Sequence, residues 1–173
     1  MGRIILITGG AKSGKSRYAL ELASGYEKKA FIATAEPVDD EMKERIKRHQ
    51  IERGPDFITV EEPVNLRRAI DHLPPGTEVA IVDCLTVWLG NLQYREGRLS
   101  IDSPMIQAFL ELLKHPPCNL IIVTNEVGSG IVPISPEVRE FRDTAGLLNQ
   151  EVARLAHKVI LTVCGIPMVL KED

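Results

Sequence analysis

The chain has 173 residues, of which 44% are hydrophobic and 26% are charged, and its formal net charge at pH 7 is −3. These values predict one globular domain over residues 1–173, and the acidic balance indicates no basic surface of the kind that nucleic-acid binding requires. The sequence shows no signal peptide and no apolar run of the roughly 18 residues that span a membrane, and its scattered cysteines (Cys84, Cys118 and Cys164) indicate reduced thiols in the cytoplasm.

The first predicted strand, Ile4–Thr8, leads into the segment Gly9–Ser16, Gly-Gly-Ala-Lys-Ser-Gly-Lys-Ser. This is the pattern G-x-x-x-x-G-K-[ST] of a phosphate-binding loop, whose glycines let backbone N–H groups point at phosphate oxygens. Lys15 is expected to supply a charge to the outer phosphates and Ser16 a hydroxyl to Mg²⁺, while a helix starting near Lys15 adds its positive dipole end. The alternative is a glycine-rich turn without a ligand. The predicted nucleotide-binding residues are Gly9, Gly10, Ala11, Lys12, Ser13, Gly14, Lys15 and Ser16.

Further along the chain, short β-branched segments alternate with longer helical patterns. This alternation predicts an α/β fold with a mostly parallel, doubly wound sheet, and the fully apolar central segments indicate strands buried on both faces. A last short run, Met168–Leu170, is expected to pair antiparallel at an edge, and the segment Gln93–Ser103 is expected to be an exposed loop. The other predicted strands are Ala30–Thr34, Phe57–Val60, Val79–Asp83, Leu120–Thr124 and Val159–Val163.

The segment Asp40–Arg53 is predicted to be a helix, with Asp39 or Asp40 as its N-cap. Its residues at i, i+4, i+7 and i+11 share one face: Met42, Ile46, His49 and Arg53. His49 therefore lies on the inward side of a largely charged helix. Two interpretations stay open, a packed structural histidine or a nucleophile whose neutral imidazole attacks phosphorus and forms a phosphoramidate.

Other polar residues are expected at the carboxyl ends of the strands, where open α/β sheets bind ligands. Asp83 ends an apolar run and is predicted to hold Mg²⁺ through water beside the phosphate loop, although a helix-capping aspartate is the alternative. The segment Ala33–Ala35 follows the second strand at the same edge. The glycine-bearing segment Thr124–Pro133 follows the fifth predicted strand at that edge, and it is either a turn or a mobile flap over a substrate.

The last predicted helix, from Pro136 to His157, carries one apolar stripe that either packs on the sheet or forms a subunit contact. Gly146 inside it costs about 1 kcal/mol relative to alanine, so either a local contact compensates or the helix breaks there. The stripe consists of Val138, Phe141, Ala145, Leu148, Val152 and Leu155.

Taken together, these segments resemble the bifunctional adenosylcobinamide kinase/adenosylcobinamide-phosphate guanylyltransferase family of cobalamin synthesis. The matching segments run in order over essentially the whole chain, and the Asn-Glu-Val-Gly and Phe-Arg-Asp segments are the most distinctive. They are Thr8–Ser16, Ile32–Ala35, Asp39–Met42, Arg45-Ile46 with His49, Asp83–Thr86, Thr124–Gly128, Gly130–Pro133, Phe141–Asp143, Gly146 and Asn149-Gln150.

The resemblance implies a trimer of RecA-like P-loop NTPase subunits with two reactions at one nucleotide site. First, the γ-phosphate of ATP or GTP passes to the aminopropanol hydroxyl of adenosylcobinamide. Second, GTP loses pyrophosphate to His49, and the GMP then passes to adenosylcobinamide phosphate, giving adenosylcobinamide-GDP. Lys15 acts in catalysis, and Ser16 and Asp83 hold Mg²⁺. The further nucleotide-binding residues are Ala33, Thr34, Ala35, Gln50, Ile51, Glu52, Arg53, Asp83 and Glu61, with Glu62 as the alternative to Glu61.

Because both steps need Mg²⁺ and fixed donors around phosphates, they can share Lys15, Ser16 and Asp83. The helix that carries His49 has to deliver it to the α-phosphate, so we expect that helix to close on GTP. Two other functions fit the phosphate loop alone. One is a simple kinase of small alcohols or nucleosides with a structural His49, and the other is a nucleotide-dependent switch, for which the sequence shows no clear signature.

Overall fold

A seven-stranded sheet forms the centre of the part that the computed structural model describes, which is residues 2–173, with residue 45 described by its backbone alone. The strand order is β3-β2-β4-β5-β1-β6-β7, and neighbours are parallel except for β6 and β7, which pair antiparallel at one edge. This confirms the predicted α/β sheet and its antiparallel edge strand. The strands are β1 (Ile4–Gly9), β2 (Lys29–Ala33), β3 (Phe57–Glu61), β4 (Val79–Asp83), β5 (Asn119–Val123), β6 (Lys158–Val163) and β7 (Ile166–Glu172).

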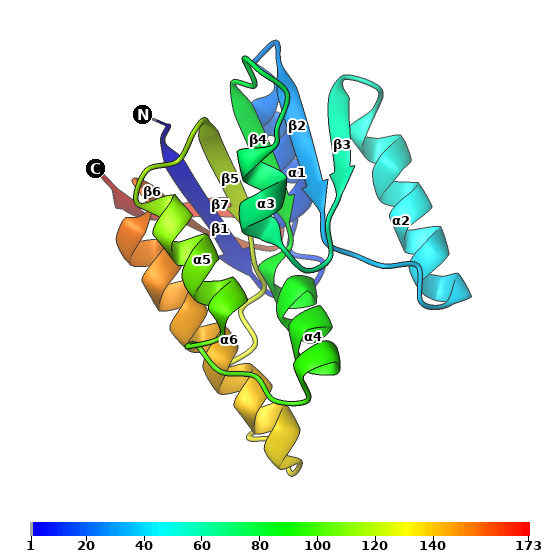
Figure 1. The fold of residues 1–173 in the computed structure, drawn as a ribbon, viewed down its shortest axis with the longest axis vertical. Helices are drawn as coiled ribbons and strands as arrows, with labels where there is room; N and C mark the ends of the chain where they lie inside the picture. Colours follow the sequence, from blue (N-terminus) through cyan, green and yellow to red (C-terminus); the bar gives the residue numbers. More distant parts are fainter. Residues whose placement is uncertain (1) are drawn as a thin grey trace.

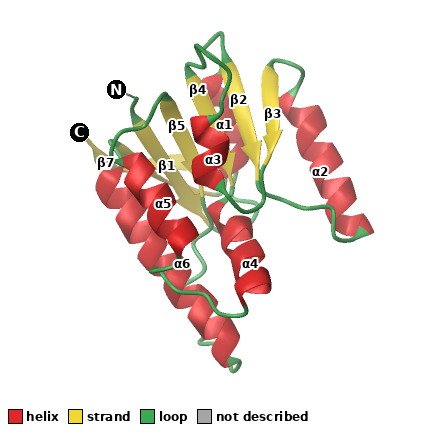
Figure 2. Ribbon diagram, in the orientation of Figure 1, coloured by secondary structure: helices red, strands yellow, loops and turns green. Residues whose placement is uncertain are grey.

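Helices cover the two faces of the sheet unequally (Figures 1 and 2). One face carries α1 (Lys15–Ala23), and the other carries the layer of α3 (Leu66–Asp71), α4 (Leu85–Glu96), α5 (Pro104–Leu113) and α6 (Pro136–Leu155). Helix α2 (Asp40–Arg53) lies beside the sheet, beyond the edge strand β3, and has the predicted bounds. Asp39 is its N-cap, because the Asp39 carboxylate accepts the N–H of Met42 at 2.7 Å.

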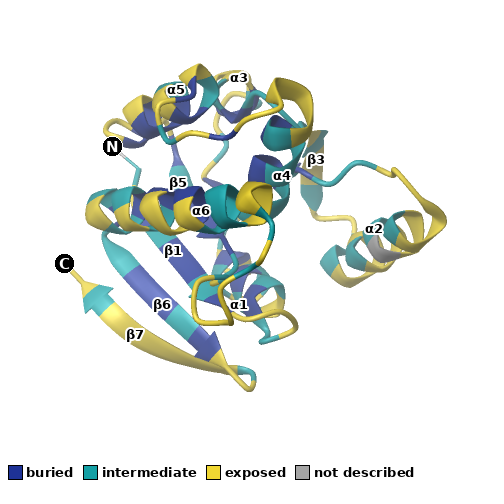
Figure 3. Ribbon diagram, turned by 90° about the horizontal axis from the view of Figure 1, so that it is seen from below, coloured by how far each residue is buried: buried dark blue, intermediate teal, exposed yellow. Residues whose placement is uncertain are grey.

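The apolar core divides along each buried strand as the pleat requires. In β1, Ile4 and Leu6 pack under the larger helical layer, whereas Ile7 packs under α1. Figure 3 shows the central strands buried, with β7 and most of α2 exposed. Trp88 of α4 is fully buried, its ring 5.3 Å from the ring of Phe109, and its indole Nε1 donates to the carbonyl oxygen of Val64 at 2.7 Å.

Two sequence predictions need correction in the helical layer. The segment Gln93–Ser103 is not an exposed loop throughout: α4 continues to Glu96, and Leu99 and Ser103 are buried. Tertiary packing explains the difference, because Leu99 belongs to the core between α4 and α5. In addition, α6 runs through Gly146 without a break and ends at Leu155 rather than His157.

The α6 stripe packs on the sheet over most of its length. Ala145, Leu148 and Val152 are buried, whereas Val138 near the start of the helix is exposed. No helix of the described residues is long and apolar enough to cross a bilayer.

Trp88→Phe is predicted to lower the free energy of unfolding by about 1–3 kcal/mol, because it leaves the Val64 carbonyl without its donor. Urea unfolding followed by circular dichroism measures the change. Tyr94→Phe, an exposed position on the same helix, is the control and is expected to unfold like the wild type. An unchanged Trp88→Phe variant would contradict a stabilising role for this hydrogen bond.

Candidate active site

The phosphate loop, Gly9–Ser16, joins β1 to α1 at the carboxyl edge of the sheet. Its backbone has positive φ at Gly9 (146°) and Gly14 (98°), a region that residues with a Cβ rarely adopt. A Cβ at Gly9 would also lie 2.4 Å from the carbonyl oxygen of Thr162, so the fold requires glycine there. Gly14 is the N-cap residue of α1 and has no side chain to accept from the first turn. The N–H groups of that turn are therefore available to an anion.

Lys15 is buried at the start of α1, an unusual position for a lysine. Its Nζ donates to the carbonyl oxygen of Gly10 at 2.5 Å, so the ammonium group lies across the loop rather than in solvent. Ser16 follows in the same turn and is partly exposed. The loop therefore combines backbone donors with the ammonium group of Lys15 and the hydroxyl of Ser16, which are groups that bind phosphate oxygens and their metal ion.

Asp83 reaches the same edge from β4, with β5 between it and the strand that carries the phosphate loop. Both Asp83 and Ile7 pair with Val123 in the register of the sheet. Because adjacent strands lie about 4.8 Å apart, the Cα atoms of Asp83 and Ile7 are about 10 Å apart. The Cys84 thiol lies near both charges of the site: burial, and after it the charge of Asp83, raise its pKa to about 11, while Lys15 acts in the opposite direction.

Thr34, directly after β2, connects the end of that strand to the segment that carries Asp83. Its side chain is fully buried, and its Oγ1 donates to the carbonyl oxygen of Cys84 and accepts the N–H of Cys84, both at 2.9 Å. The side-chain amide of Asn91 donates to the carbonyl oxygens of Thr34 and Pro63, at 2.7 Å and 3.0 Å. The predicted nucleotide-binding Thr34 thus uses its hydroxyl to hold the backbone directly after Asp83.

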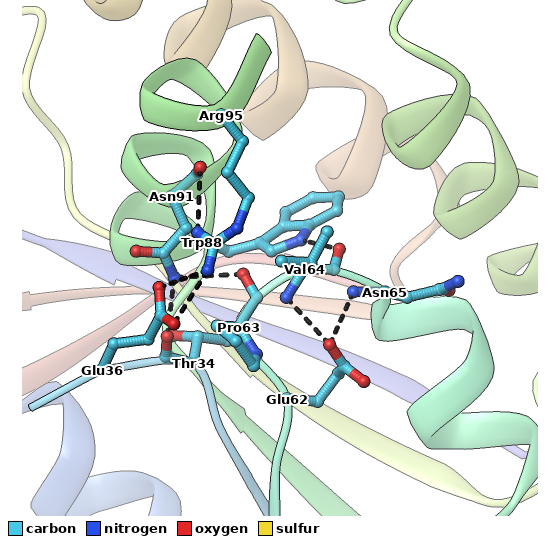
Figure 4. A network of polar contacts seen from close by, with 9 residues as sticks. All are labelled: Thr34, Glu36, Glu62, Pro63, Val64, Asn65, Trp88, Asn91 and Arg95. Carbon is cyan, nitrogen blue, oxygen red and sulfur yellow. Dashed lines mark hydrogen bonds and ion pairs between the residues drawn. The ribbon is translucent and has the colours of Figure 1, made fainter.

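Glu61 and Glu62, which the sequence left as alternatives, have different positions. The Glu62 carboxylate accepts the N–H groups of Val64 and Asn65, each at 2.9 Å, and so holds the turn before α3 (Figure 4). Glu61, the last residue of β3, lines a pocket instead. The geometry therefore places Glu61, and not Glu62, at the candidate site.

This pocket, of about 70 Å³, lies between α2 and the carboxyl ends of β2, β3 and β4. No residue of the phosphate loop lines it, and its link to the loop is Cys84, whose thiol is close enough to Lys15 for that charge to act on its pKa. The pocket brings together one face of α2, which the helical period had predicted, and the residues at the sheet edge. Its lining residues are Phe31, Ala33, Ala35, Met42, Ile46, His49, Gln50, Arg53, Thr59, Glu61, Asp83, Cys84 and Val87.

Arg53 anchors the end of α2 in this pocket. Its guanidinium lies 4.2 Å from the centre of the Phe31 ring, a cation–π contact. Burial lowers the pKa of Arg53, and the charges of Glu61 and Asp83 oppose that shift. The pocket therefore contains one guanidinium with two carboxylates around it.

His49 lines the pocket with its side chain 40% exposed, and its Nδ1 lies 3.5 Å from a carboxylate oxygen of Glu52. Gln50 also faces the pocket. Ile51 and Glu52 do not line it, and Ile51 is 73% exposed. The helix thus presents His49, Gln50 and Arg53 to the site and turns the other two predicted residues away from it.

The segment Thr124–Pro133 has a fixed base and an exposed tip. At the base, the Thr124 hydroxyl donates to the side-chain oxygen of Asn149 at 2.8 Å, and the Glu126 N–H donates to the carbonyl oxygen of Gly9 at 3.0 Å. A hydrogen bond from the Ser129 hydroxyl is the largest of the effects that lower the pKa of Glu126. Further on, Ile131 is 96% exposed. The structure therefore places the base of this segment directly against the phosphate loop.

Mg²⁺ fits the donors at this edge. Among the described residues no group of three or more His, Cys, Asp or Glu side chains forms a metal site. The Ser16 hydroxyl and the Asp83 carboxylate offer oxygen atoms only, and Mg²⁺ prefers such ligands together with water and phosphate oxygens. A nucleotide would supply the remaining ligands.

A larger hollow of about 320 Å³ lies between α5 and α6, away from this edge. Its charged residues include two ion pairs, Glu111 with Lys114 and Glu151 with Arg154. None of the predicted site residues lines it. The candidate site is therefore the smaller pocket at the carboxyl ends of β2, β3 and β4.

Asn91, which holds Thr34 in place, is not among the site residues expected from the sequence. Its signal in the sequence was its place among Trp88, Leu89 and Leu92, the buried residues of a helix that also carries other polar side chains. The distance along the chain between Asn91 and its partners hid the contact, since Thr34 and Pro63 precede it by 57 and 28 residues.

Comparison with known proteins decides the family. Residues 5–170 match the family described as cobinamide kinase / cobinamide phosphate guanyltransferase. The chain belongs to this family. It is 41% identical over 170 residues to the bifunctional adenosylcobalamin biosynthesis protein CobP of Pseudomonas aeruginosa, with 97% of each chain covered. It is 37% identical over 181 residues to the CobU protein of Escherichia coli, which covers 97% of this chain and 99% of the relative.

Membership in the cobinamide kinase / guanyltransferase family makes the chain an enzyme, a transferase of cobalamin biosynthesis. Its fold is similar to that of an ATPase from the type III secretion system of pathogenic bacteria, with a TM-score of 0.52 and 11% sequence identity. The alignment covers 93% of this chain and 51% of the ATPase, so the chain spans about half the length of that protein. The likeness concerns the fold alone and agrees with the predicted α/β fold and its mostly parallel sheet.

Thr34→Val, which keeps the shape of the side chain and removes its hydroxyl, is predicted to lower the free energy of unfolding by about 1–3 kcal/mol, because the buried backbone of Cys84 loses its partner. The kcat/KM for nucleotide is expected to fall about tenfold, since Asp83 is no longer held in place. Urea unfolding and steady-state kinetics measure the two effects. Thr34→Ser keeps the hydroxyl and should stay within about twofold of wild type. Full activity in Thr34→Val would show that this hydroxyl does not position Asp83.

Proposed function

We propose that this enzyme catalyses two consecutive transfers at one Mg²⁺-nucleotide site. It phosphorylates adenosylcobinamide with ATP or GTP, and it then transfers GMP from GTP to adenosylcobinamide phosphate through a GMP-histidine intermediate. The observation that carries the proposal is that His49 and Asp83 line one pocket, and that Asp83 lies level with the strand end that leads into the phosphate loop. A kinase needs the phosphate loop and Asp83 but has no use for a histidine in that place.

In the kinase step, the hydroxyl oxygen of adenosylcobinamide attacks the γ-phosphorus of the nucleotide, the bond to the β-phosphate oxygen breaks, and the hydroxyl proton is released. The loop N–H groups and Lys15 stabilise the charge on the phosphate oxygens. Mg²⁺, held by Ser16 and through water by Asp83, would neutralise the departing phosphate. Lys15 already lies over the loop, through its contact with Gly10.

In the second step, an imidazole nitrogen of His49 attacks the α-phosphorus of GTP and pyrophosphate departs. A phosphate oxygen of adenosylcobinamide phosphate then attacks the same phosphorus, which breaks the N–P bond and frees His49. The Glu52 carboxylate faces Nδ1 of His49 at 3.5 Å, which favours a proton on Nδ1 and leaves the lone pair on Nε2. We therefore assign Nε2 as the nucleophilic atom.

The charged residues of the pocket support a guanine nucleotide. Guanine presents acceptors at O6 and N7 and a donor at its N2 amino group. Arg53 supplies donors and Glu61 an acceptor, both on the pocket wall. Gln50, Ala33 and Ala35 complete the part of the wall that we assign to the nucleotide.

Helix α2 has to move during the second step. Sites that enclose small ligands measure roughly 300–1,000 Å³, whereas the pocket under α2 is about 70 Å³. The helix stands apart from the body beyond β3 (Figures 1 and 3), and its outer residues are exposed. In the segment that leads into α2, both carboxylate oxygens of Glu36 accept from the Arg95 guanidinium at 2.8 Å. We propose that α2 opens to admit GTP and closes again with His49 on the α-phosphate.

A labelling experiment tests the mechanism. The protein is incubated with Mg²⁺ and GTP labelled at the α-phosphate and is then denatured. We expect label on the polypeptide that is lost in acid and retained in alkali, as a phosphoramidate requires. His49→Ala should abolish it, and His72→Ala, a control at an exposed histidine on α3's C-cap, should keep it.

Label that survives His49→Ala would contradict the proposed nucleophile. Complete absence of label, with γ-phosphate still passing to adenosylcobinamide, would leave a simple kinase. Hydrolysis of GTP without transfer to any acceptor would instead favour a nucleotide-dependent switch.

We also propose that the enzyme works in the cytoplasm as a homotrimer. The three cysteines are free, with Cys84 and Cys118 buried. Two separate apolar surfaces support a ring of identical subunits, because a head-to-tail contact uses two different patches of each subunit. One patch is the tip around Ile131 and Ile134, each 96% exposed, and the other is the outer surface of β7, with Ile166, Met168 and Leu170.

Light scattering coupled to size-exclusion chromatography is expected to give three times the mass of one chain. The double variant Ile131→Asp with Ile134→Asp should elute as a monomer with unchanged circular dichroism, because charged residues in an apolar contact oppose association. Arg98→Asp, on the exposed turn after α4, is the matched control and should stay trimeric. A monomeric wild-type protein would contradict the proposed assembly.

A further inference from the structure

The hairpin turn between β6 and β7 supports the phosphate loop from the side opposite to β5. Val163 pairs with Ile166, which leaves a two-residue turn of Cys164 and Gly165 with φ of 53° and 79°. Two positive φ values in succession are those of a type I′ turn, the usual tight turn of a hairpin. The turn therefore has one well-defined shape, and the phosphate loop packs on it.

Two backbone features join the turn to the loop. The N–H of Gly165 donates to the carbonyl oxygen of Ser13 at 2.9 Å. A Cβ at Gly14 would lie 3.1 Å from the Cα of Gly165, so the two glycines pack directly against each other. Position 14 therefore requires glycine for two reasons, its positive φ and its close contact with Gly165.

A chain of hydroxyl groups adds a third connection. The Thr162 side chain is 1% exposed, and its Oγ1 lies 2.7 Å from the Ser13 Oγ and 3.3 Å from the carbonyl oxygen of Thr8. A carbonyl only accepts and a hydroxyl has one proton, so Thr162 donates to Thr8 and Ser13 donates to Thr162. The side chain of Ser13 is thereby directed away from the phosphate side of the loop and toward β6.

We infer that Thr162 is a positioning residue for nucleotide binding, which acts by holding Ser13 and, through it, the N–H groups of the phosphate loop. The inference rests on the proposed use of this loop as the nucleotide site. Thr162 contacts no phosphate itself. Its effect is to keep the loop in the conformation that binds phosphate before the nucleotide arrives, which lowers the ordering cost of binding.

Thr162→Val keeps the shape of the side chain and removes the hydroxyl. The dissociation constants of Mg²⁺-GTP and Mg²⁺-ATP, measured by calorimetry, are expected to rise about tenfold, while the KM for adenosylcobinamide stays within about twofold. Thr162→Ser should bind nucleotide like the wild type. Ser13→Ala should weaken nucleotide binding as Thr162→Val does, and the double variant should be no weaker than either single one, because both substitutions break the same contact.

The control is Thr77→Val, just before the amino end of β4, where the Thr77 hydroxyl donates to the carbonyl oxygen of Pro74 at 2.7 Å. It removes the same kind of hydrogen bond and is expected to leave nucleotide affinity unchanged. Wild-type affinity in Thr162→Val, or additive losses in the double variant, would overturn the positioning role. A wild-type protein that binds no nucleotide would overturn the proposed function, and the inference with it. If Thr162→Val does not fold, Ser13→Ala and Thr162→Ser decide the question by the same affinities.

Discussion

Parallel pairing among strands buried on both faces is the constraint on which the site depends. Since β1, β5 and β4 run in the same direction, their carboxyl ends meet at one edge of the sheet, and the shared partner Val123 brings Ile7 and Asp83 level. Backbone pairing therefore brings the phosphate loop and the carboxylate of Asp83 to one edge of the sheet. A shift of one strand along its neighbour would move Asp83 away from the phosphate loop.

Buried threonines repeat one structural solution at this edge. Thr34, Thr124 and Thr162 each lie at or just after the end of a strand, and each uses its hydroxyl to bind a segment that no strand pairing holds. A hydroxyl suits this task because a small side chain with one donor and two lone pairs can satisfy backbone or side-chain partners within a packed interior. Thr162 in this way keeps the phosphate loop in place without making it part of the sheet, while Thr34 and Thr124 bind the start of α4 and the side of α6.

The site thus consists of one half that the sheet holds and one half that stands beside it. Backbone and hydroxyl hydrogen bonds connect the phosphate loop to β6, and the Gly9 carbonyl accepts from the Glu126 N–H. Helix α2 meets the sheet through an apolar and basic face that ends at Arg53, on the ring of Phe31. A fixed phosphate loop beside a helix that stands apart from the sheet suits the two transfers that we propose for one nucleotide site.

The sequence by itself determined the phosphate loop, the strands with their alternating helices, the bounds of α2 and the face that His49 shares with Arg53, because glycine spacing and apolar periodicity are local properties. Only the tertiary structure decided that Glu61 rather than Glu62 lines the pocket, that Leu99 is buried in a segment expected to be an exposed loop, and that Thr34 holds the backbone of Cys84. It also decided that Asn91 and Thr162 support the site. Those contacts join residues that are 28 to 154 positions apart in the chain, and no local pattern records which distant backbone atom a polar side chain will meet.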